Sequence, residues 1–211
     1  THTREKSILK YNQHSVRCTW VLIALCTVVF VWQMWNASWR FAPIQQNMMF
    51  GPATVDLISQ GAQMSPCIIE SHQWWRIFSS QFLHGGVLHI GFNMYGLWAL
   101  AGPMEMEFGW LRMFVIYLVS GTSSALSTAL LLPNAVGLGA SGAICGLVGA
   151  EWAELLMNSK LYGSGFCQRF CQLFAPTLLL FLLSLAPGVN FFAPFSGMVC
   201  GPLLGLALGV R

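Results

Sequence analysis

The stretch "GLGASGAIC" at residues 137–145 places one serine, Ser141, among glycines and alanines inside a very apolar chain. The 211-residue chain is 55% apolar and only 8% charged. Soluble domains carry about 25% charged residues, so most of this surface must face lipid or protein. Ser141 is therefore either a small residue that lets two helices touch or a buried nucleophile, and the rest of the chain has to decide between the two.

The apolar residues gather in stretches long enough to cross a membrane. A spanning helix needs about 20 mostly apolar residues. We predict an all-α, polytopic bundle of six helices over residues 18–211, preceded by a basic N-terminal tail, 1–17. The expected spans are 18–35, 77–101, 110–132, 141–158, 168–187 and 192–210. The long segment between the first two is too polar to span and too apolar for a free linker, which indicates short amphipathic pieces at the membrane surface.

Lysines and arginines fall unevenly on the two sides of these spans. With the N-terminus inside, the outer segments hold only Arg40 and Arg76. The inner segments hold the other basic residues, Arg4, Lys6, Lys10, Arg17, Arg112, Lys160, Arg169 and Arg211. This positive-inside bias predicts that both ends of the chain face the cytoplasm or the mitochondrial matrix.

Glycines recur along the last predicted span, "SGMVCGPLLGLALG" at residues 196–209. Positions 197, 201, 205 and 209 form a four-fold GxxxG stripe, a pattern that lets two membrane helices approach closely. The fourth span offers a matching groove in Gly142, Gly146 and Ala150. We therefore expect these two helices to cross in contact, with Ser141 at one end of that contact.

The second predicted span carries polar residues that are costly in lipid. His89 and Asn93 are four apart and share one face of a helix. Taken alone they are as well explained as polar contacts between helices. A helix start at Ser141 would add free N–H donors and the positive end of the helix dipole, so the three residues together could form an oxyanion hole.

These motifs together resemble the rhomboid intramembrane serine proteases. "WWRIFSSQFLHGG" (74–86) is similar to the family's tryptophan–arginine motif, and "HIGFNMYGLW" (89–98) matches its HxxxN stretch. "EMEFGWLR" (105–112) and "GLGASGAICG" (137–146) match the glutamate–arginine segment and the GxSG motif around the nucleophile. The resemblance implies the rhomboid fold, Ser141 as nucleophile, and His89 and Asn93 as oxyanion donors; its wording is nearest to the mitochondrial, presenilin-associated branch.

One position departs from the family pattern. Active rhomboids carry AHxxG in the last helix, where the histidine is the general base, but this chain reads "APFSG" at 193–197, with Pro194 at that position. No histidine follows His89 in the sequence. A serine hydroxyl is a weak nucleophile without a base, and proline offers no side-chain acceptor. Proline is also favoured in the first turn of a helix, so Pro194 has a structural explanation too.

The resemblance and the departure together predict a rhomboid-like pseudoprotease, with Ser141, His89 and Asn93 as vestiges of the site. Such proteins bind transmembrane or translocating polypeptides, and the mitochondrial likeness points to a subunit of an inner-membrane protein translocase. The alternative is an active protease that uses Ser141 with an unconventional base; a transporter is poorly supported because no inverted repeat is visible. We expect lipid, clients and a larger membrane complex as partners, and neither nucleic acid, cofactor nor metal.

Two further predictions concern charged residues. Glu105 and Arg112 are expected to pair and fix the loop after the second span. Glu151 and Glu154 lie several turns along the fourth span from Ser141, where contact with solvent or lipid headgroups is the expected role.

Overall fold

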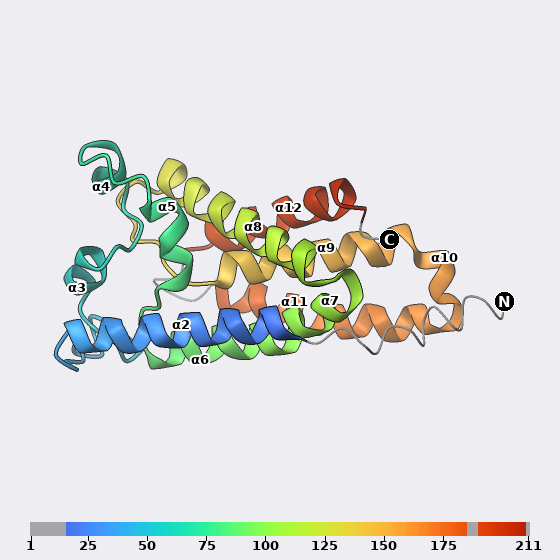
Figure 1. Ribbon diagram of the computed structural model, residues 1–211, viewed down its shortest axis with the longest axis horizontal. Helices are drawn as coiled ribbons and strands as arrows, with labels where there is room; N and C mark the ends of the chain where they lie inside the picture. Colours follow the sequence, from blue (N-terminus) through green and yellow to red (C-terminus); the bar gives the residue numbers. More distant parts are fainter. Residues whose placement is uncertain (1–15, 185–189, 210–211) are drawn as a thin grey trace.

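The computed structural model describes residues 16–184 and 190–209, and its named elements are all helices (Figure 1). Almost all of the predicted N-terminal tail lies outside the described residues. An isolated antiparallel bridge joins Gln63 to Gly137. In chain order the elements are α2 (Arg17–Asn36), α3 (Thr54–Ser59), α4 (Ser65–Ile69), α5 (Arg76–Ser79), η2 (Ser80–Phe82), α6 (Val87–Gly96), η3 (Leu97–Ala101), α7 (Gly102–Phe108), α8 (Trp110–Leu131), α9 (Ser141–Met157), α10 (Ser159–Tyr162), η4 (Gly163–Gly165), α11 (Phe166–Ser184) and α12 (Phe192–Ala207).

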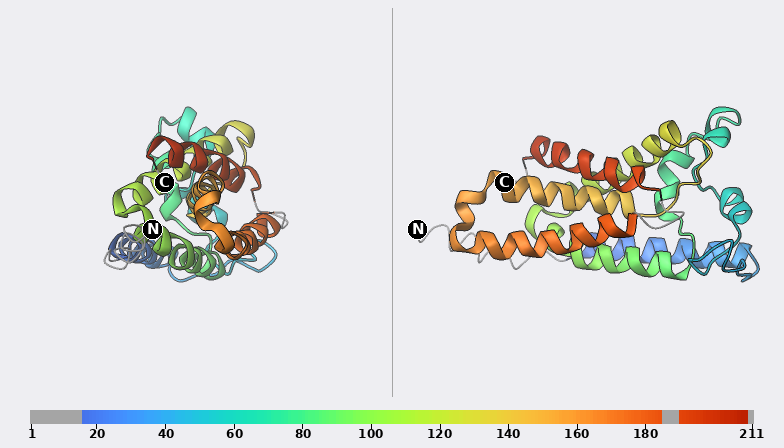
Figure 2. Two further views of the ribbon diagram at one scale, coloured as in Figure 1. Left: turned by 90° about the vertical axis from the view of Figure 1, so that its right-hand side faces the viewer. Right: turned by 180° about the vertical axis from the view of Figure 1, so that it is seen from behind.

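The chain is an all-α polytopic membrane protein, as predicted. Three helical stretches are long and apolar enough to cross a bilayer: Arg17–Asn36, Trp110–Leu131 and Ser159–Leu182. The helix α12 is equally apolar but shorter, and its 16 residues reach about 24 Å at 1.5 Å per residue. Figure 2 shows α9 enclosed by the other helices, and nearly every residue of its first ten is buried.

The second predicted span, 77–101, is displaced along the chain. Short turns occupy residues 76–82, and the long helix begins only at Val87 and continues through the π-helical segment η3 into α7. The cause is the pair Gly85 and Gly86, where a loop crosses the chain. A Cβ on Gly86 would collide with the carbonyl of Met49, so only glycine permits this crossing.

The last two predicted spans also differ at their ends. The helix α11 starts at Phe166 and its description ends at Ser184, so the end of the predicted span at 187 lies outside the described residues. The helix α12 ends at Ala207, and Gly209 lies beyond it with φ +62°. Gly209 therefore does not belong to the helical glycine face, which consists of Gly197, Gly201 and Gly205.

The contact between α9 and α12 is made by backbone against backbone. A Cβ on Gly197 would meet the carbonyl of Gly142, and a Cβ on Gly201 would meet that of Gly146. One turn further, Gly205 lies against Ala150: a Cβ added to Gly205 would be 3.3 Å from the Cβ of Ala150. The expected glycine faces thus lie opposite each other, turn by turn. Close approach of this kind is what small residues provide where lipid supplies no hydrophobic driving force.

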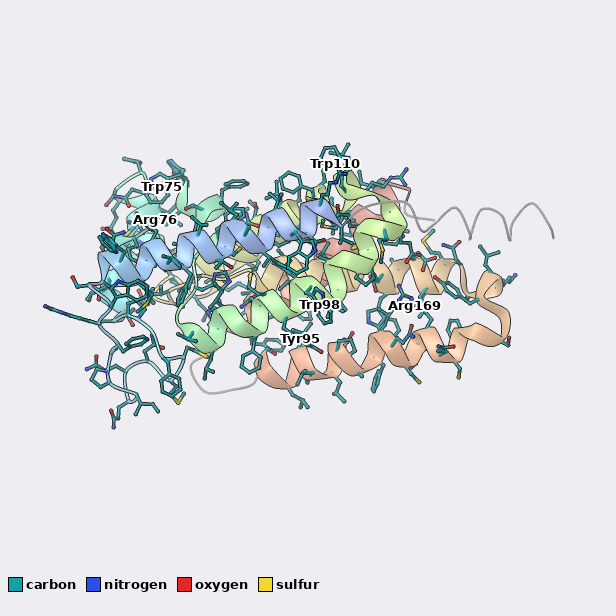
Figure 3. The ribbon with its side chains drawn as sticks, turned by 60° about the horizontal axis from the view of Figure 1, so that its bottom comes forward. Trp75, Arg76, Tyr95, Trp98, Trp110 and Arg169 are labelled. Carbon is teal, nitrogen blue, oxygen red and sulfur yellow. The ribbon has the colours of Figure 1, made fainter. Side chains whose placement is uncertain are left out.

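The segment between α2 and α6 is a loop with short helices and exposed aromatic side chains. Arg76, only 5% exposed, ties it together. Its Nη1 donates to the carbonyls of Ile58 (2.7 Å) and Ala62 (2.8 Å), and its guanidinium lies 5.0 Å from the ring centroid of Trp75 (Figure 3). The tryptophan–arginine motif therefore acts as a structural clamp on the interfacial loop.

Glu105 does not pair with Arg112, so that prediction is wrong. The Glu105 carboxylate is 1% exposed and accepts hydrogen bonds from the backbone N–H of Cys18 (2.9 Å) and of Thr19 (2.7 Å). The Thr19 hydroxyl donates a third bond, at 2.7 Å. Arg112 is exposed on α8. The first turn of a helix has N–H groups without intrahelical partners, and Glu105 satisfies them at the start of α2.

Glu151 and Glu154 are buried, at 3% and 5% exposed, and do not face solvent as predicted. Arg169 of α11 lies 3.3 Å from Glu151 and 3.4 Å from Glu107 of α7. Glu154 accepts hydrogen bonds from the Tyr162 hydroxyl (2.6 Å) and the Asn158 amide (3.2 Å). A buried carboxylate requires such partners; Glu151 finds its partner on α11, and Glu154 finds both of its partners just after the end of α9.

Candidate functional site

All four predicted site residues line one cavity of about 310 Å³. Ser141 comes from α9, His89 and Asn93 from α6, and Pro194 from α12. The cavity also receives Leu180 and Ser184 from α11, so it lies where four helices converge. The structure thus brings together residues that are more than 100 positions apart in the sequence.

Ser141 is the first residue of α9 and is half-buried. The chain reaches it through Gly139, which has φ +107°, a left-handed conformation that favours glycine. A Cβ at Gly139 would also lie 2.7 Å from Nε2 of His89. Close contact with the histidine is thus a second reason for glycine at this position. The GxSG pattern is therefore explained by backbone geometry around the start of the helix.

His89 presents a donor to the cavity. The backbone N–H of Gly85 donates to its Nδ1 at 3.1 Å. A neutral imidazole has one N–H, so the proton lies on Nε2, the atom beside Gly139. A nitrogen that carries a proton cannot take one from a serine. In this arrangement His89 can stabilise a negative oxygen but cannot serve as the general base for Ser141.

Asn93 lies one turn further along α6 and is 5% exposed. Its Nδ2 donates to the carbonyl of His89 at 2.8 Å, which uses one of the two amide hydrogens. The second hydrogen and the amide oxygen have no hydrogen-bond partner among the described residues. Since Asn93 lines the cavity, this side chain can offer hydrogen bonds to a bound group.

Pro194 lies in the first turn of α12, two residues after the helix begins at Phe192. A missing N–H is harmless there because first-turn N–H groups have no intrahelical acceptor. Pro194 brings no acceptor to the cavity, and no hydrogen bond joins the Ser141 hydroxyl to a base within the described residues. The described residues thus bring Ser141, His89 and Asn93 to one cavity but supply no base for the serine.

The interfacial loop supports His89 in a way that the sequence did not reveal. The Asn47 amide donates to the carbonyls of Pro52 (2.8 Å) and Gly85 (2.7 Å). Gly85 in turn donates its N–H to His89, so Asn47 is linked to the histidine through the backbone of one residue. Loop carbonyls also accept the free N–H groups at the start of α6, from Val87 (2.9 Å) and Leu88 (3.2 Å).

Two further polar residues that position the site were missed. The Ser124 hydroxyl of α8 donates to the carbonyl of Ala193 at 2.9 Å, next to Pro194. Asn190 donates to the Thr128 hydroxyl (2.6 Å) and accepts from the N–H of Phe192 (3.0 Å), so it caps the start of α12. Ser120, Ser124 and Thr128 recur every four residues on α8, and this spacing was the available signal.

Comparison with known proteins agrees with this geometry. The rhomboid domain matches residues 71–211. The chain is 34% identical over 168 residues to "RHOMBOID-like protein 6, mitochondrial" of Arabidopsis thaliana, covering 80% of this chain and 54% of that protein. It is 33% identical over 159 residues to "Inactive RHOMBOID-like protein 8" of the same species, covering 75% and 45%.

A third relative is "Inactive rhomboid protein 1" of Danio rerio, 30% identical over 135 residues, which covers 64% of this chain and 16% of that protein. The chain spans about half the length of the Arabidopsis relatives that it matches. The domain match covers all four helices that build the cavity, and the matching stretch contains every predicted site residue. The chain belongs to the rhomboid family.

Proposed function

We propose that this chain is a rhomboid-like pseudoprotease that binds transmembrane or translocating polypeptides as a subunit of a mitochondrial inner-membrane protein translocase. The observation that carries the proposal is Pro194 at the place of the base, beside a Ser141 whose surroundings are otherwise intact. The tautomer of His89 argues in the same direction, because its cavity-facing nitrogen is already protonated. The mitochondrial relative and the two relatives called inactive support the proposal by likeness.

Client binding is supported by an aromatic surface next to the cavity. Tyr95 and Trp98 are 64% and 56% exposed, and their ring centroids are 5.9 Å apart. Both project from the α6–η3 helix on the side where α11 runs (Figure 3). Phe195 of α12 follows the cavity-lining Pro194 in the chain and is 55% exposed. Rigid aromatic side chains of this kind are enriched where proteins bind partners.

The proposal is tested by site-specific photocrosslinking in mitochondria. Benzoylphenylalanine at Trp98 or Phe195 is expected to crosslink to a radiolabelled preprotein that is arrested in transit by a folded C-terminal domain. The matched control is the same probe at Leu130 of α8, which is 78% exposed and does not line the cavity. Adducts at Trp98 and Phe195 that need the arrested preprotein support the proposal. Equal labelling at Leu130, or none at any position, contradicts it.

The translocase assignment has its own readout. The unaltered chain, extracted in mild detergent, should migrate on a native gel with a large complex that also holds the arrested preprotein. A chain that migrates alone while still crosslinking to clients would remove the translocase role and leave client binding.

A further inference from the structure

The cavity presents hydrogen-bond donors without a matching base. His89, Asn93 and Ser141 line it, and they carry the Nε2–H, an unused amide hydrogen and the first N–H of α9. None of the residues that line it in the described part of the chain carries a carboxylate. A histidine at 194 would accept the Ser141 proton, whereas Pro194 leaves that hydroxyl able to donate. Without a base, these donors suit an oxygen-rich, negatively charged group.

Two independent observations mark this as more than a helix start. Asn93 is 5% exposed, faces the cavity, and has an amide hydrogen and an oxygen without a partner in the described chain. The cavity is also enclosed on several sides by helices, and its 310 Å³ falls at the lower end of the roughly 300–1,000 Å³ typical of ligand pockets. The N-terminus of α9 then adds its dipole, which favours an anion.

The remaining lining is apolar and reaches the lipid-facing surface. Phe92, Leu138, Ile144 and Leu180 form much of the wall. Phe92 is 58% exposed on α6 while it lines the cavity, so the cavity lies beside the surface that faces lipid. The span that contains α11 has only 6% of its residues buried, so this wall is thin. A ligand that enters here comes from the bilayer and has an apolar chain.

We propose that the cavity binds the carboxylate of a single-chain fatty acid, with its chain along the apolar wall and into the bilayer. A carboxylate has two oxygens that accept several hydrogen bonds, which suits donors from α6 and α9 on two sides of the cavity. The small volume fits one chain end and excludes a two-chain lipid with its headgroup. Binding is non-covalent, and it goes beyond the proposed role in client binding.

The test uses the full chain in phosphatidylcholine nanodiscs and a diazirine-bearing palmitic acid. Competition with oleate, methyl oleate and oleyl alcohol measures whether the site prefers a carboxylate over an ester or an alcohol on the same chain. We expect oleate to compete at roughly tenfold lower concentration than the ester or the alcohol, as charge-assisted hydrogen bonds imply. Peptide mapping should place the photoadducts on α6, α9 and α11 near the cavity. Equal competition by all three, or adducts elsewhere, would overturn the proposal.

Variants separate carboxylate recognition from simple chain packing. His89→Phe and Asn93→Leu should reduce the preference for acid over ester to near unity, while His72→Phe on the exposed interfacial loop should keep it. If the α6 variants do not purify as folded protein, Ser141→Ala is used, which should lower the preference in part. If Ser141→Ala keeps the full preference for acid over ester, and the ester competes as it does in the unaltered chain, the carboxylate site is contradicted. The client crosslinks at Trp98 are measured without added fatty acid. Client binding and fatty-acid binding can therefore fail independently of each other.

Discussion

Gly201 of α12 lies directly against the backbone carbonyl of Gly146 of α9, with no side chain between them. A Cβ added to Gly201 would also come within 2.9 Å of the Gly146 Cα. Both neighbours are backbone atoms, which cannot rotate away as a flexible side chain would. This contact sets the distance between the two helices that carry Ser141 and Pro194, so the dimensions of the cavity depend on it.

Substitution of Gly201 by alanine should therefore destabilise the fold by about 1–3 kcal/mol, the usual range for overpacking a tight core. The matched control is Gly91→Ala on α6, where a Cβ meets nothing within 4 Å. That change should be neutral or stabilise by up to about 1 kcal/mol, because alanine favours helix interiors. Unfolding in detergent, followed by circular dichroism, measures both. Equal stability of the two variants would show that the helices separate easily.

Replacing Pro194 by histidine should restore reactivity to Ser141. The unaltered chain is expected to remain unlabelled by a fluorophosphonate probe, since a serine without its base keeps only about 10³–10⁴-fold catalysis over water. In Pro194→His an adduct should form, and in Pro194→His with Ser141→Ala it should vanish. The measurement is in-gel fluorescence with peptide mapping. Strong labelling of the unaltered chain that disappears in Ser141→Ala would contradict the pseudoprotease proposal.

Removal of the Glu105 side chain should detach the start of α2. In Glu105→Ala two buried backbone N–H groups and the Thr19 hydroxyl lose their acceptor. Each unsatisfied group costs about 1–3 kcal/mol, so the expected loss exceeds 2 kcal/mol. Hydrogen exchange at Cys18 and Thr19 should rise. The control Glu70→Ala, at an exposed position of the interfacial loop, should change neither quantity.

Substitution of Arg169 by glutamine should loosen α11. Glu151 is 3% exposed and would lose its cationic partner, and an unpaired buried charge costs about 3–5 kcal/mol. Arg112→Gln is the matched control, because that arginine is exposed on α8. Unfolding midpoints and the hydrogen exchange of α11 report the effect. If Arg112→Gln destabilised as much as Arg169→Gln, net charge and not this contact would explain the result.

The sequence predicted the parts of the site that depend on periodicity. His89 and Asn93 four residues apart, and Gly142 and Gly146 with the same spacing, define helix faces, and the structure shows those faces turned to one another or to the cavity. The displaced start of α6 was missed because Gly86 was read as part of a helix. Gly86 instead lets the loop at Met49 cross the chain closely.

Contacts to backbone atoms escaped prediction for a different reason. Asn47 is linked to His89 through the backbone of Gly85, and Glu105 accepts from N–H groups of α2. A backbone partner can belong to any residue type, so the sequence gives no pattern to match. The nearby charge of Arg112 in the sequence therefore predicted a pair with Glu105 that the fold does not form. Similarly, the pairing of Glu151 with Arg169 depends on how α11 packs on α9, which no local pattern contains.

One stripe of α12 bears on how such a protein can evolve. Pro194, Gly197, Gly201 and Gly205 are three or four residues apart, so they share the side of the helix that packs on α9. A side chain at Gly197 or Gly201 would collide with the backbone of α9, whereas Pro194 lies at the end of the stripe that lines the cavity. A replacement at position 194 therefore changes the contents of the cavity and leaves the packed part of the interface as it is, so the two can vary independently during evolution.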